Sequence, residues 1–238
     1  MSVDAPHIDA IRKLREQLGD DIVRTPLLQC TGIEDELDNG TRVFGKLEFL
    51  QRTGTFKARG ALSVVSQLTA AHRAQGVTAV SAGNHAIAVA YAAKTFGVHA
   101  KLVMISTANP LRVAACRALG AEVIMAGDAH TAFARVEAIR DEEGRFFVHP
   151  FEGPGIAAGT GTLGLEVCEQ CEDFDVMLVP VGGGGLIAGV ANAVRQLRPQ
   201  CRVIGIEPFG ADSMYRSFES GKPEAVDSVQ TIADSLGA

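Results

Sequence analysis

The sequence predicts an α/β protein built on parallel sheets. Short apolar runs alternate with helical segments of roughly ten to fifteen residues, which is the pattern of a parallel layered sheet. Alanine, glycine and valine are abundant and aromatic residues make up only 5% of the chain, which suits closely packed helix-on-sheet layers. The 238 residues are enough for one large domain or two small ones.

The predicted elements follow one another in a regular order. Residues 8–15 carry apolar side chains at helical spacing, and Pro26 prevents that helix from continuing. Residues 43–48 predict a strand, and the Gly-Thr-Phe-Lys turn at 54–57 leads into an Ala/Val/Leu-rich helical run. Further strands are expected at residues 77–80, 100–105, 122–126, 146–148, 176–181 and 202–206. Further helices are expected after residue 84 to about 96, at 111–119, at 129–143, around 162–167 and after residue 185 to about 197.

Composition and charge argue against several classes of protein. The net charge is -6 and the basic residues are scattered, so we expect no nucleic-acid partner. No apolar run reaches about 18 residues, so no membrane span is expected. The N-terminus has neither the basic nor the apolar region of a secretion signal, and we therefore expect a cytoplasmic protein.

The five cysteines show no disulfide framework, because their number is odd and their spacing irregular. Cys168 and Cys171 form a CxxC pair, which could be redox-active or half of a zinc site. No second CxxC accompanies it, and the flanking residues 162–167 are typical of a helix. We interpret the pair as plain helical cysteines.

The run Gly182–Leu186 follows a predicted strand and opens a helix. Glycines let the backbone approach a ligand closely and aim N–H groups at an anion, and the helix start adds positive potential. The run is not a P-loop and does not fit the dinucleotide fingerprint. We predict that Gly182, Gly183, Gly184 and Gly185, with Leu186, bind a phosphate group. The alternative is a tight turn packed under a sheet.

A second loop, Ser81–His85, also follows a strand and opens a helix. The hydroxyl of Ser81, the amide of Asn84 and the backbone N–H groups of the loop suit a carboxylate such as that of an amino acid. His85 could act as an acid or a base, or it could hydrogen-bond its own loop. In parallel α/β folds, ligands bind beyond the carboxyl ends of the strands, where both loops are expected.

Lys57 lies between Phe56 and a predicted helix. Partial desolvation and the positive helix start both favour the neutral amine, which forms a Schiff base with an aldehyde. Taken alone, Lys57 would be interpreted as a solvated lysine in a turn. Together with a phosphate loop that lacks nucleotide features and a carboxylate loop, it predicts pyridoxal 5′-phosphate as cofactor and a small amino acid as substrate.

These residues lie in blocks that resemble the threonine/serine dehydratases, which are fold-type II pyridoxal-phosphate enzymes related to serine racemase. The resemblance implies two parallel-sheet layered domains of the tryptophan synthase β type. Residues 1–75 and 146–238 would form a large cofactor-binding domain, and residues 76–145 a small mobile one. The resembling blocks, in family order, are Arg24–Leu27, Lys46–Glu48, Gly54–Ala61, Ser81–His85, His149–Phe151, Gly159–Thr162, Gly182–Leu186 and Ile204–Pro208.

The resemblance also implies a role for each part of the site. Lys57 would hold the cofactor as a Schiff base and remove the Cα proton, Phe56 would pack against the pyridine ring, and Asn84 would hydrogen-bond the ring hydroxyl. The implied reaction is that of an ammonia-lyase, which converts threonine, serine or a related β-hydroxy amino acid to a 2-oxo acid and ammonia. The residues implied to bind the substrate carboxylate are Ser81, Gly83, Asn84 and His85.

The sequence departs from the family pattern near the expected cleft. Thr55 replaces a serine, a mild change that keeps the hydroxyl. Thr160 replaces a glutamine, and Ile87 and Ala88 replace a Gln-Gly pair, and these losses of polar groups bear on the substrate more than on the cofactor. Ala82 stands where serine racemases place a second acid/base serine. Because alanine cannot carry a proton, Ala82 argues against racemisation.

Two further departures concern a metal and the C-terminus. Glu207 matches one cation ligand of racemase-like relatives, but Ser213 stands where a second carboxylate is expected, so we predict no metal. The chain ends at Ala238, before the segment that in the family supplies the partner of the pyridine nitrogen. We therefore expect exposed core surface and a homodimer or homo-oligomer, unless the chain is a truncated one.

Three hypotheses follow from these observations. The leading one is the dehydratase described above. The second is a pyridoxal-phosphate-binding protein with little or no turnover because of the short C-terminus. The third is an enzyme of the same family that catalyses racemisation or β-replacement.

Overall fold

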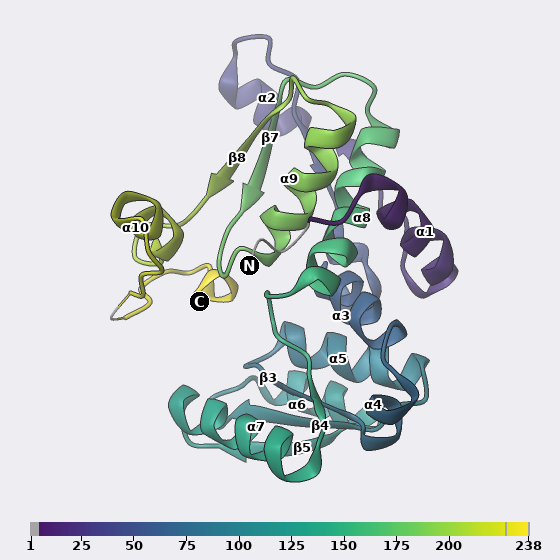
Figure 1. The fold of residues 1–238 in the computed structure, drawn as a ribbon. Helices are drawn as coiled ribbons and strands as arrows, with labels where there is room; N and C mark the ends of the chain where they lie inside the picture. Colours follow the sequence, from purple (N-terminus) through teal and green to yellow (C-terminus); the bar gives the residue numbers. More distant parts are fainter. Residues whose placement is uncertain (1–4, 227, 238) are drawn as a thin grey trace.

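The structure is a computed structural model, and it describes residues 5–226 and 228–237. These residues form one four-stranded sheet and two two-stranded sheets, with helices packed on them (Figure 1). The predicted α/β class with parallel layers is confirmed. Within the described ranges, none of the helices combines the length and the hydropathy that a membrane span requires.

The four-stranded sheet forms the lower part of the molecule in Figure 1. Its order is β5-β4-β3-β6, and every pair of neighbouring strands is parallel. The sheet extends to Phe147, past the predicted small-domain boundary at residue 145. The strands are β3 (Val77–Val80), β4 (Ala100–Ile105), β5 (Glu122–Ala126) and β6 (Phe146–Phe147).

Helices cover both faces of this sheet. Side chains of a strand alternate between faces, so Ala79 and Leu102 belong to one apolar cluster while Val80 and Val103 belong to another. The first cluster includes side chains of α5 and α6, and the second includes side chains of α7. The three helices are α5 (Asn84–Thr95), α6 (Pro110–Ala118) and α7 (Ala129–Glu143), each within one residue of its predicted end where one was predicted.

The upper part holds the other two sheets. Strands β7 (Val176–Pro180) and β8 (Arg202–Ile206) pair in parallel, whereas β1 (Leu27–Gln29) and β2 (Phe44–Lys46) pair antiparallel. The antiparallel pair differs from the parallel pattern predicted for the chain. The remaining α-helices are α1 (Ile8–Leu18), α2 (Thr31–Leu37), α3 (Lys57–Ser66), α4 (Ala70–Gln75), α8 (Pro154–Gln170), α9 (Gly185–Leu197) and α10 (Ser213–Ser220).

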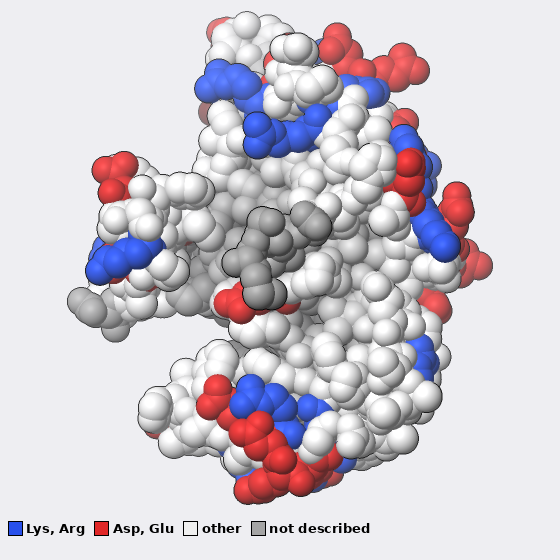
Figure 2. All heavy atoms as spheres, in the orientation of Figure 1, with Lys and Arg blue, Asp and Glu red and all other residues white. Residues whose placement is uncertain are grey.

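Helices α8 and α9 pack with their backbones in close contact, and this packing fixes the start of α9. A Cβ atom added at Gly164 would lie 2.9 Å from the Val190 carbonyl oxygen, and one added at Gly189 would overlap the Thr160 hydroxyl. Larger residues would force the helices apart. The glycine loop before α9 is therefore held against the body of the upper part. On the face drawn in Figure 2, the surface is hollowed between the upper and lower parts.

Candidate active site

Lys57 is the first residue of α3, and the turn before it fixes its direction. Thr55 Oγ1 accepts the backbone N–H of Lys57 at 3.1 Å, and Lys57 Nζ donates to the Pro150 carbonyl at 2.6 Å. The Phe56 ring centroid lies 5.4 Å from Nζ. Burial lowers the pKa of Lys57 to about 8, because the charged ammonium is poorly solvated there. A substantial share of this amine is therefore neutral near physiological pH.

Two histidines lie near Lys57, and burial disfavours their charged forms. His85 Nε2 lies 2.9 Å from the Val148 carbonyl, an acceptor, so this nitrogen carries the hydrogen. Burial and then the charge of Lys57 lower the pKa of His85 to about 3, so the ring is neutral at physiological pH. The pKa of His149 is also lowered, chiefly by burial, with Glu152 opposing the shift. The His85 ring bonds the backbone at Val148 rather than its own loop.

The glycine loop lies between β7 and α9, and its glycines are required by close contacts. Gly184 has φ of 83°, in the left-handed region. A Cβ at Gly183 would overlap the Phe151 ring, and one at Gly185 would lie 2.6 Å from the Phe151 carbonyl oxygen. Helix α9 has no side-chain cap at its start. Among the described residues, no side chain accepts the N–H groups of its first turn, which include that of Leu186.

Lys57 and Gly185, the last glycine of the loop, line one small cavity. A lysine with a lowered pKa suits an aldehyde, and an uncapped helix start preceded by glycines suits a phosphate. The residues present therefore fit pyridoxal phosphate. The lining residues are Phe56, Lys57, Gly60, His85, Pro150, Ile156, Thr160 and Gly185.

The Ser81–His85 loop follows β3 and opens α5. Ser81 Oγ accepts the Gly83 N–H at 3.0 Å, and α5 has no side-chain cap. Asn84 is the first residue of α5 and is half-buried, whereas Ala82 is exposed. The loop thus joins a hydroxyl to the free N–H groups of a helix start, while the His85 ring points away to Val148.

The residues that depart from the family pattern have structural partners. Thr160 Oγ1 lies 3.0 Å from the Ile156 carbonyl and 2.9 Å from the Gly185 carbonyl, so it links α8 to the start of α9. On α5, Ile87 is half-buried and Ala88 is buried.

Glu207 acts as a helix cap in this structure. Its carboxylate accepts the N–H groups of Met214 at 2.9 Å and Tyr215 at 2.7 Å, in the first turn of α10. In the described part of the chain, no cluster of three or more His, Cys, Asp or Glu residues could hold a metal ion.

A buried ion network next to α3 was not predicted from the sequence. Arg59 is fully buried and makes paired hydrogen bonds to Glu48 at 2.8 Å and to Glu166 at 2.8 and 2.9 Å. A further bond of 3.0 Å joins it to Thr162. The signal for this network was present, since Glu166 is a lone charge in the otherwise uncharged run 161–168.

Glu166 extends the network to other elements. Lys46 Nζ donates to Glu166 at 2.7 Å, and Arg15 Nε donates to it at 3.0 Å. Lys46 also donates to the Thr25 carbonyl and to Gln170, both at 2.8 Å. The network thereby connects α1, β2, α3 and α8, and it fixes α3 from the side opposite its first residue.

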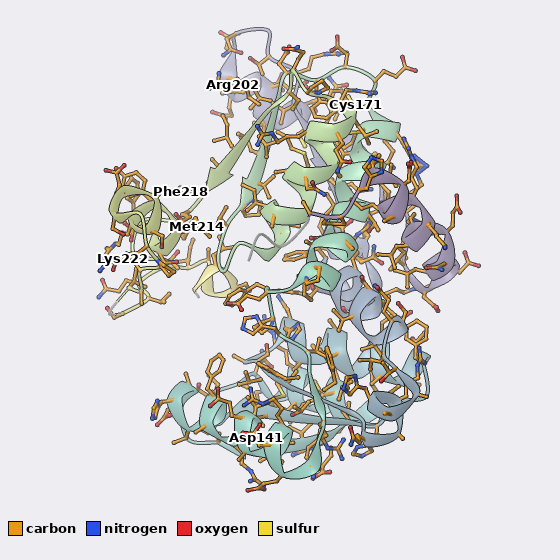
Figure 3. All side chains as sticks on the ribbon, in the orientation of Figure 1. Asp141, Cys171, Arg202, Met214, Phe218 and Lys222 are labelled. Carbon is orange, nitrogen blue, oxygen red and sulfur yellow. The ribbon has the colours of Figure 1, made fainter. Side chains whose placement is uncertain are left out.

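The CxxC pair lies away from this cavity. Cys168 is buried within α8, and Cys171 follows the last residue of that helix. The cavity is lined by Ile156 and Thr160 at the other end of α8, and Figure 3 labels Cys171 in the upper part near Arg202. The prediction of helical cysteines holds for Cys168 and not for Cys171, and the described cysteines are all free thiols.

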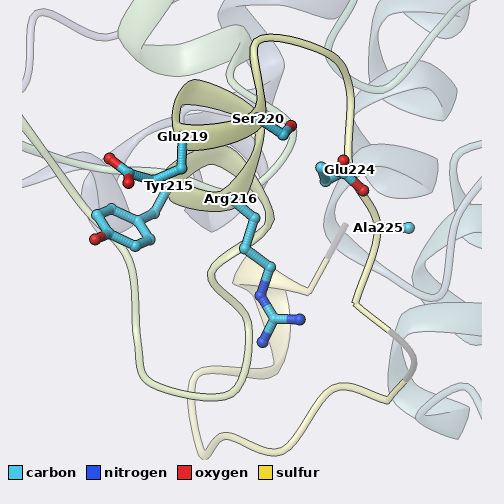
Figure 4. Close-up of a pocket in the computed structure, with 6 residues that line it drawn as sticks. All are labelled: Tyr215, Arg216, Glu219, Ser220, Glu224 and Ala225. Carbon is cyan, nitrogen blue, oxygen red and sulfur yellow. The ribbon is translucent and has the colours of Figure 1, made fainter.

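A second, open hollow lies beside α10 (Figure 4). It is lined by Tyr215, Arg216, Glu219, Ser220, Glu224 and Ala225, and it contains none of the predicted site residues. Arg216 is paired with Asp212 at 3.0 Å. The hollow brings together no group that the chemistry of Lys57 would use.

The chain is similar to several known proteins. The family described as "Pyridoxal-phosphate dependent enzyme" matches residues 18–238. The chain is 55% identical over 233 residues to phenylserine dehydratase of Ralstonia pickettii, covering 98% of this chain and 71% of that protein. It is similar to the structure of maize serine racemase, with TM-score 0.93, 35% identity, and coverage of 98% of this chain and 71% of that one. It is also similar to the structure of a T.th. threonine deaminase, with TM-score 0.89, 40% identity, and coverage of 98% and 75%.

Proposed function

Because the chain belongs to the pyridoxal-phosphate dependent enzymes, we propose that it is a dehydratase of β-hydroxy amino acids. The reaction removes water across Cα and Cβ, and hydrolysis of the resulting enamine gives a 2-oxo acid and ammonia. The water lost in the first step is regained in the second, so the net change is loss of ammonia. The observation that carries this proposal is that Lys57 and Gly185 line one cavity.

Several residues have separate roles in the proposed reaction. Pyridoxal phosphate, when bound, supplies an aldehyde for Lys57 and a ring that accepts electrons from Cα. Lys57 Nζ, whose pKa is lowered to about 8 by burial, is the group that takes the Cα proton. The Phe56 ring packs beside it, the first turn of α9 binds the phosphate, and Asn84 reaches the ring hydroxyl. The Ser81–His85 loop holds the substrate carboxylate.

One relative supports a substrate with an aryl side chain. The relative with 55% identity is a phenylserine dehydratase, so we expect phenylserine to be turned over along with threonine and serine. Racemisation would need a second acid/base group opposite Lys57. Ala82 cannot supply it, and burial keeps the His85 ring neutral, with its Nε2–H bonded to Val148.

The test is release of 2-oxo acid from a panel of phenylserine, threonine and serine, with chiral analysis of the recovered amino acid. We expect a 2-oxo acid from at least one of them and no accumulation of the opposite enantiomer. A protein that absorbs in the visible with pyridoxal phosphate but releases no 2-oxo acid would support a binding protein instead. Racemised substrate without 2-oxo acid would support the racemase alternative.

The proposal also covers the motion of the small domain, the location of the protein and its assembly. We expect residues 76–145 to move as a small domain over the cavity and the protein to be cytoplasmic. We also expect a homodimer or homo-oligomer, because Phe209, Phe218 and Ile232 are fully or almost fully exposed. Sedimentation of the purified protein at several concentrations would test the assembly.

A further inference from the structure

Arg112 lies on the Ser81–His85 loop, although it is distant from that loop in the sequence. Strands β3 and β4 are parallel neighbours, so the segments after them leave the same edge of the sheet. Asn109 accepts the Leu111 N–H at 2.9 Å and Pro110 occupies the first position of α6, which places Arg112 in the first helical turn. The start of α6 is therefore fixed beside the start of α5.

The contact between Arg112 and the loop is direct. A Cβ added at Gly83 would lie 2.6 Å from Arg112 Nη1 and 2.9 Å from Arg112 Nε. A side chain at position 83 would therefore displace the end of the Arg112 side chain.

The charge of Arg112 has no partner among the described residues. Its side chain is half-buried, yet no described residue gives it an ion pair or a hydrogen bond. The other half-buried or buried basic side chains of the described ranges are partnered, namely Arg15, Lys46, Lys57, Arg59, Arg73, Lys101, Arg145 and Arg198. The guanidinium of Arg112 and the uncapped start of α5 both carry positive potential. Their proximity favours the binding of an anion between them.

We propose that Arg112 binds the carboxylate of the amino acid substrate, together with the Ser81–His85 loop. This inference rests on the proposed function, because it takes the amino acid site as given. The guanidinium places a full positive charge directly against Gly83 of this loop. Arg112 then discriminates amino acids from amines, whereas Lys57 reacts with the amino group that both classes share.

The experiment separates the carboxylate from the amine. Alanine and ethylamine are titrated into the protein saturated with pyridoxal phosphate, and the change in the visible absorption of the cofactor gives a dissociation constant for each. Neither probe has a β-hydroxyl, so binding is measured without turnover. The variants are Arg112→Met, Arg112→Lys and the matched control Arg117→Met, an exposed arginine in the last turn of the same helix.

We expect Arg112→Met to weaken alanine binding by about 10- to 100-fold and to change ethylamine binding by less than about twofold. Arg112→Lys should lie between Arg112→Met and the unaltered protein, and Arg117→Met should change neither constant. Equal losses for alanine and ethylamine, or an unchanged alanine constant, would overturn the proposal. Because the titration needs no 2-oxo acid, a protein without turnover would overturn the dehydratase function and still leave Arg112 tested.

Discussion

Lys57 and Arg59 lie two residues apart on α3, but their surroundings differ sharply. Burial by itself disfavours the charged form of both side chains. In Arg59 the paired hydrogen bonds to Glu48 and Glu166 outweigh this effect, and the pKa is raised. No carboxylate of the described residues pairs with Lys57, and burial alone lowers its pKa to about 8. Burial of a cation therefore has opposite consequences depending on whether an acid is buried with it. The network stabilises α3, whereas Lys57 is the base of the proposed reaction.

The largest expected effect comes from replacing Lys57. Lys57→Met should lower kcat for 2-oxo acid release by about 10³-fold or more, because the base at Cα is lost. The free energy of unfolding should not fall, since the network around Arg59 is untouched. Lys94→Met, an exposed lysine on α5, is the control and should retain full activity. Activity left in Lys57→Met within tenfold of the unaltered protein would exclude Lys57 as that base.

Breaking the network around Arg59 should instead lower the free energy of unfolding. Glu166→Ala leaves Arg59 and Lys46 buried without their acid, and should lower the free energy of unfolding by about 3–5 kcal/mol in urea titrations. Glu169→Ala is the matched control on the same helix, because its partner Arg24 is 3.2 Å away at the surface. We expect it to cost less than about 1 kcal/mol. Similar costs for the two variants would mean that the network does not stabilise α3 more than a surface pair does.

The lowered pKa of Lys57 predicts that the free energy of unfolding depends on pH. In protein freed of pyridoxal phosphate, the pKa of Lys57 is about 8 when folded, against the ordinary lysine value of 10.5. Between these values the unfolded chain holds a proton that the folded protein has released, so stability rises with pH. Below about 8 the folded protein bears the full cost of the desolvated ammonium.

Lys57→Met should therefore be more stable than the unaltered protein at pH 7, and the difference should shrink as the pH rises from about 8 to 10.5. Unfolding in urea across this range measures it. A difference for Lys57→Met that stays constant over this window would mean that this lysine is solvated.

A smaller effect is expected at the loop that Arg112 covers. Gly83→Ala places a methyl group 2.6 Å from Arg112 Nη1, so the guanidinium must move. Alanine binding to the cofactor-loaded protein should weaken by about tenfold, whereas in an Arg112→Met background the same change should cost less than about threefold. Equal losses in both backgrounds would place the effect in the loop itself.

Much of the secondary structure and the type of cofactor could be predicted from local sequence, but the network and the position of Arg112 could not. Strand β4 and helix α7 were predicted with their bounds, because each carries a complete periodic pattern between glycines or turns. The glycine loop is unusual by itself, whereas Lys57 gained its predicted role only in combination with the two loops. Glu166 lies 107 positions from Arg59, and their pairing follows only from tertiary packing. The antiparallel pairing of β1 with β2 was likewise not predicted, since three-residue strands carry little pattern.

The smallest effect concerns strain in the turn that presents Lys57. Thr53 is β-branched and has φ of 65°, a left-handed conformation that such residues rarely adopt, and its buried hydroxyl has no hydrogen-bond partner among the described residues. Thr53→Gly should therefore raise the free energy of unfolding by about 1 kcal/mol. Thr55→Gly is the control with the opposite sign, because Thr55 is extended at φ of -155° and its hydroxyl accepts the Lys57 N–H. If Thr53→Gly raises stability but lowers kcat, the strain in this turn serves to position Lys57. If it lowers stability, the left-handed turn is held by contacts that outweigh its strain.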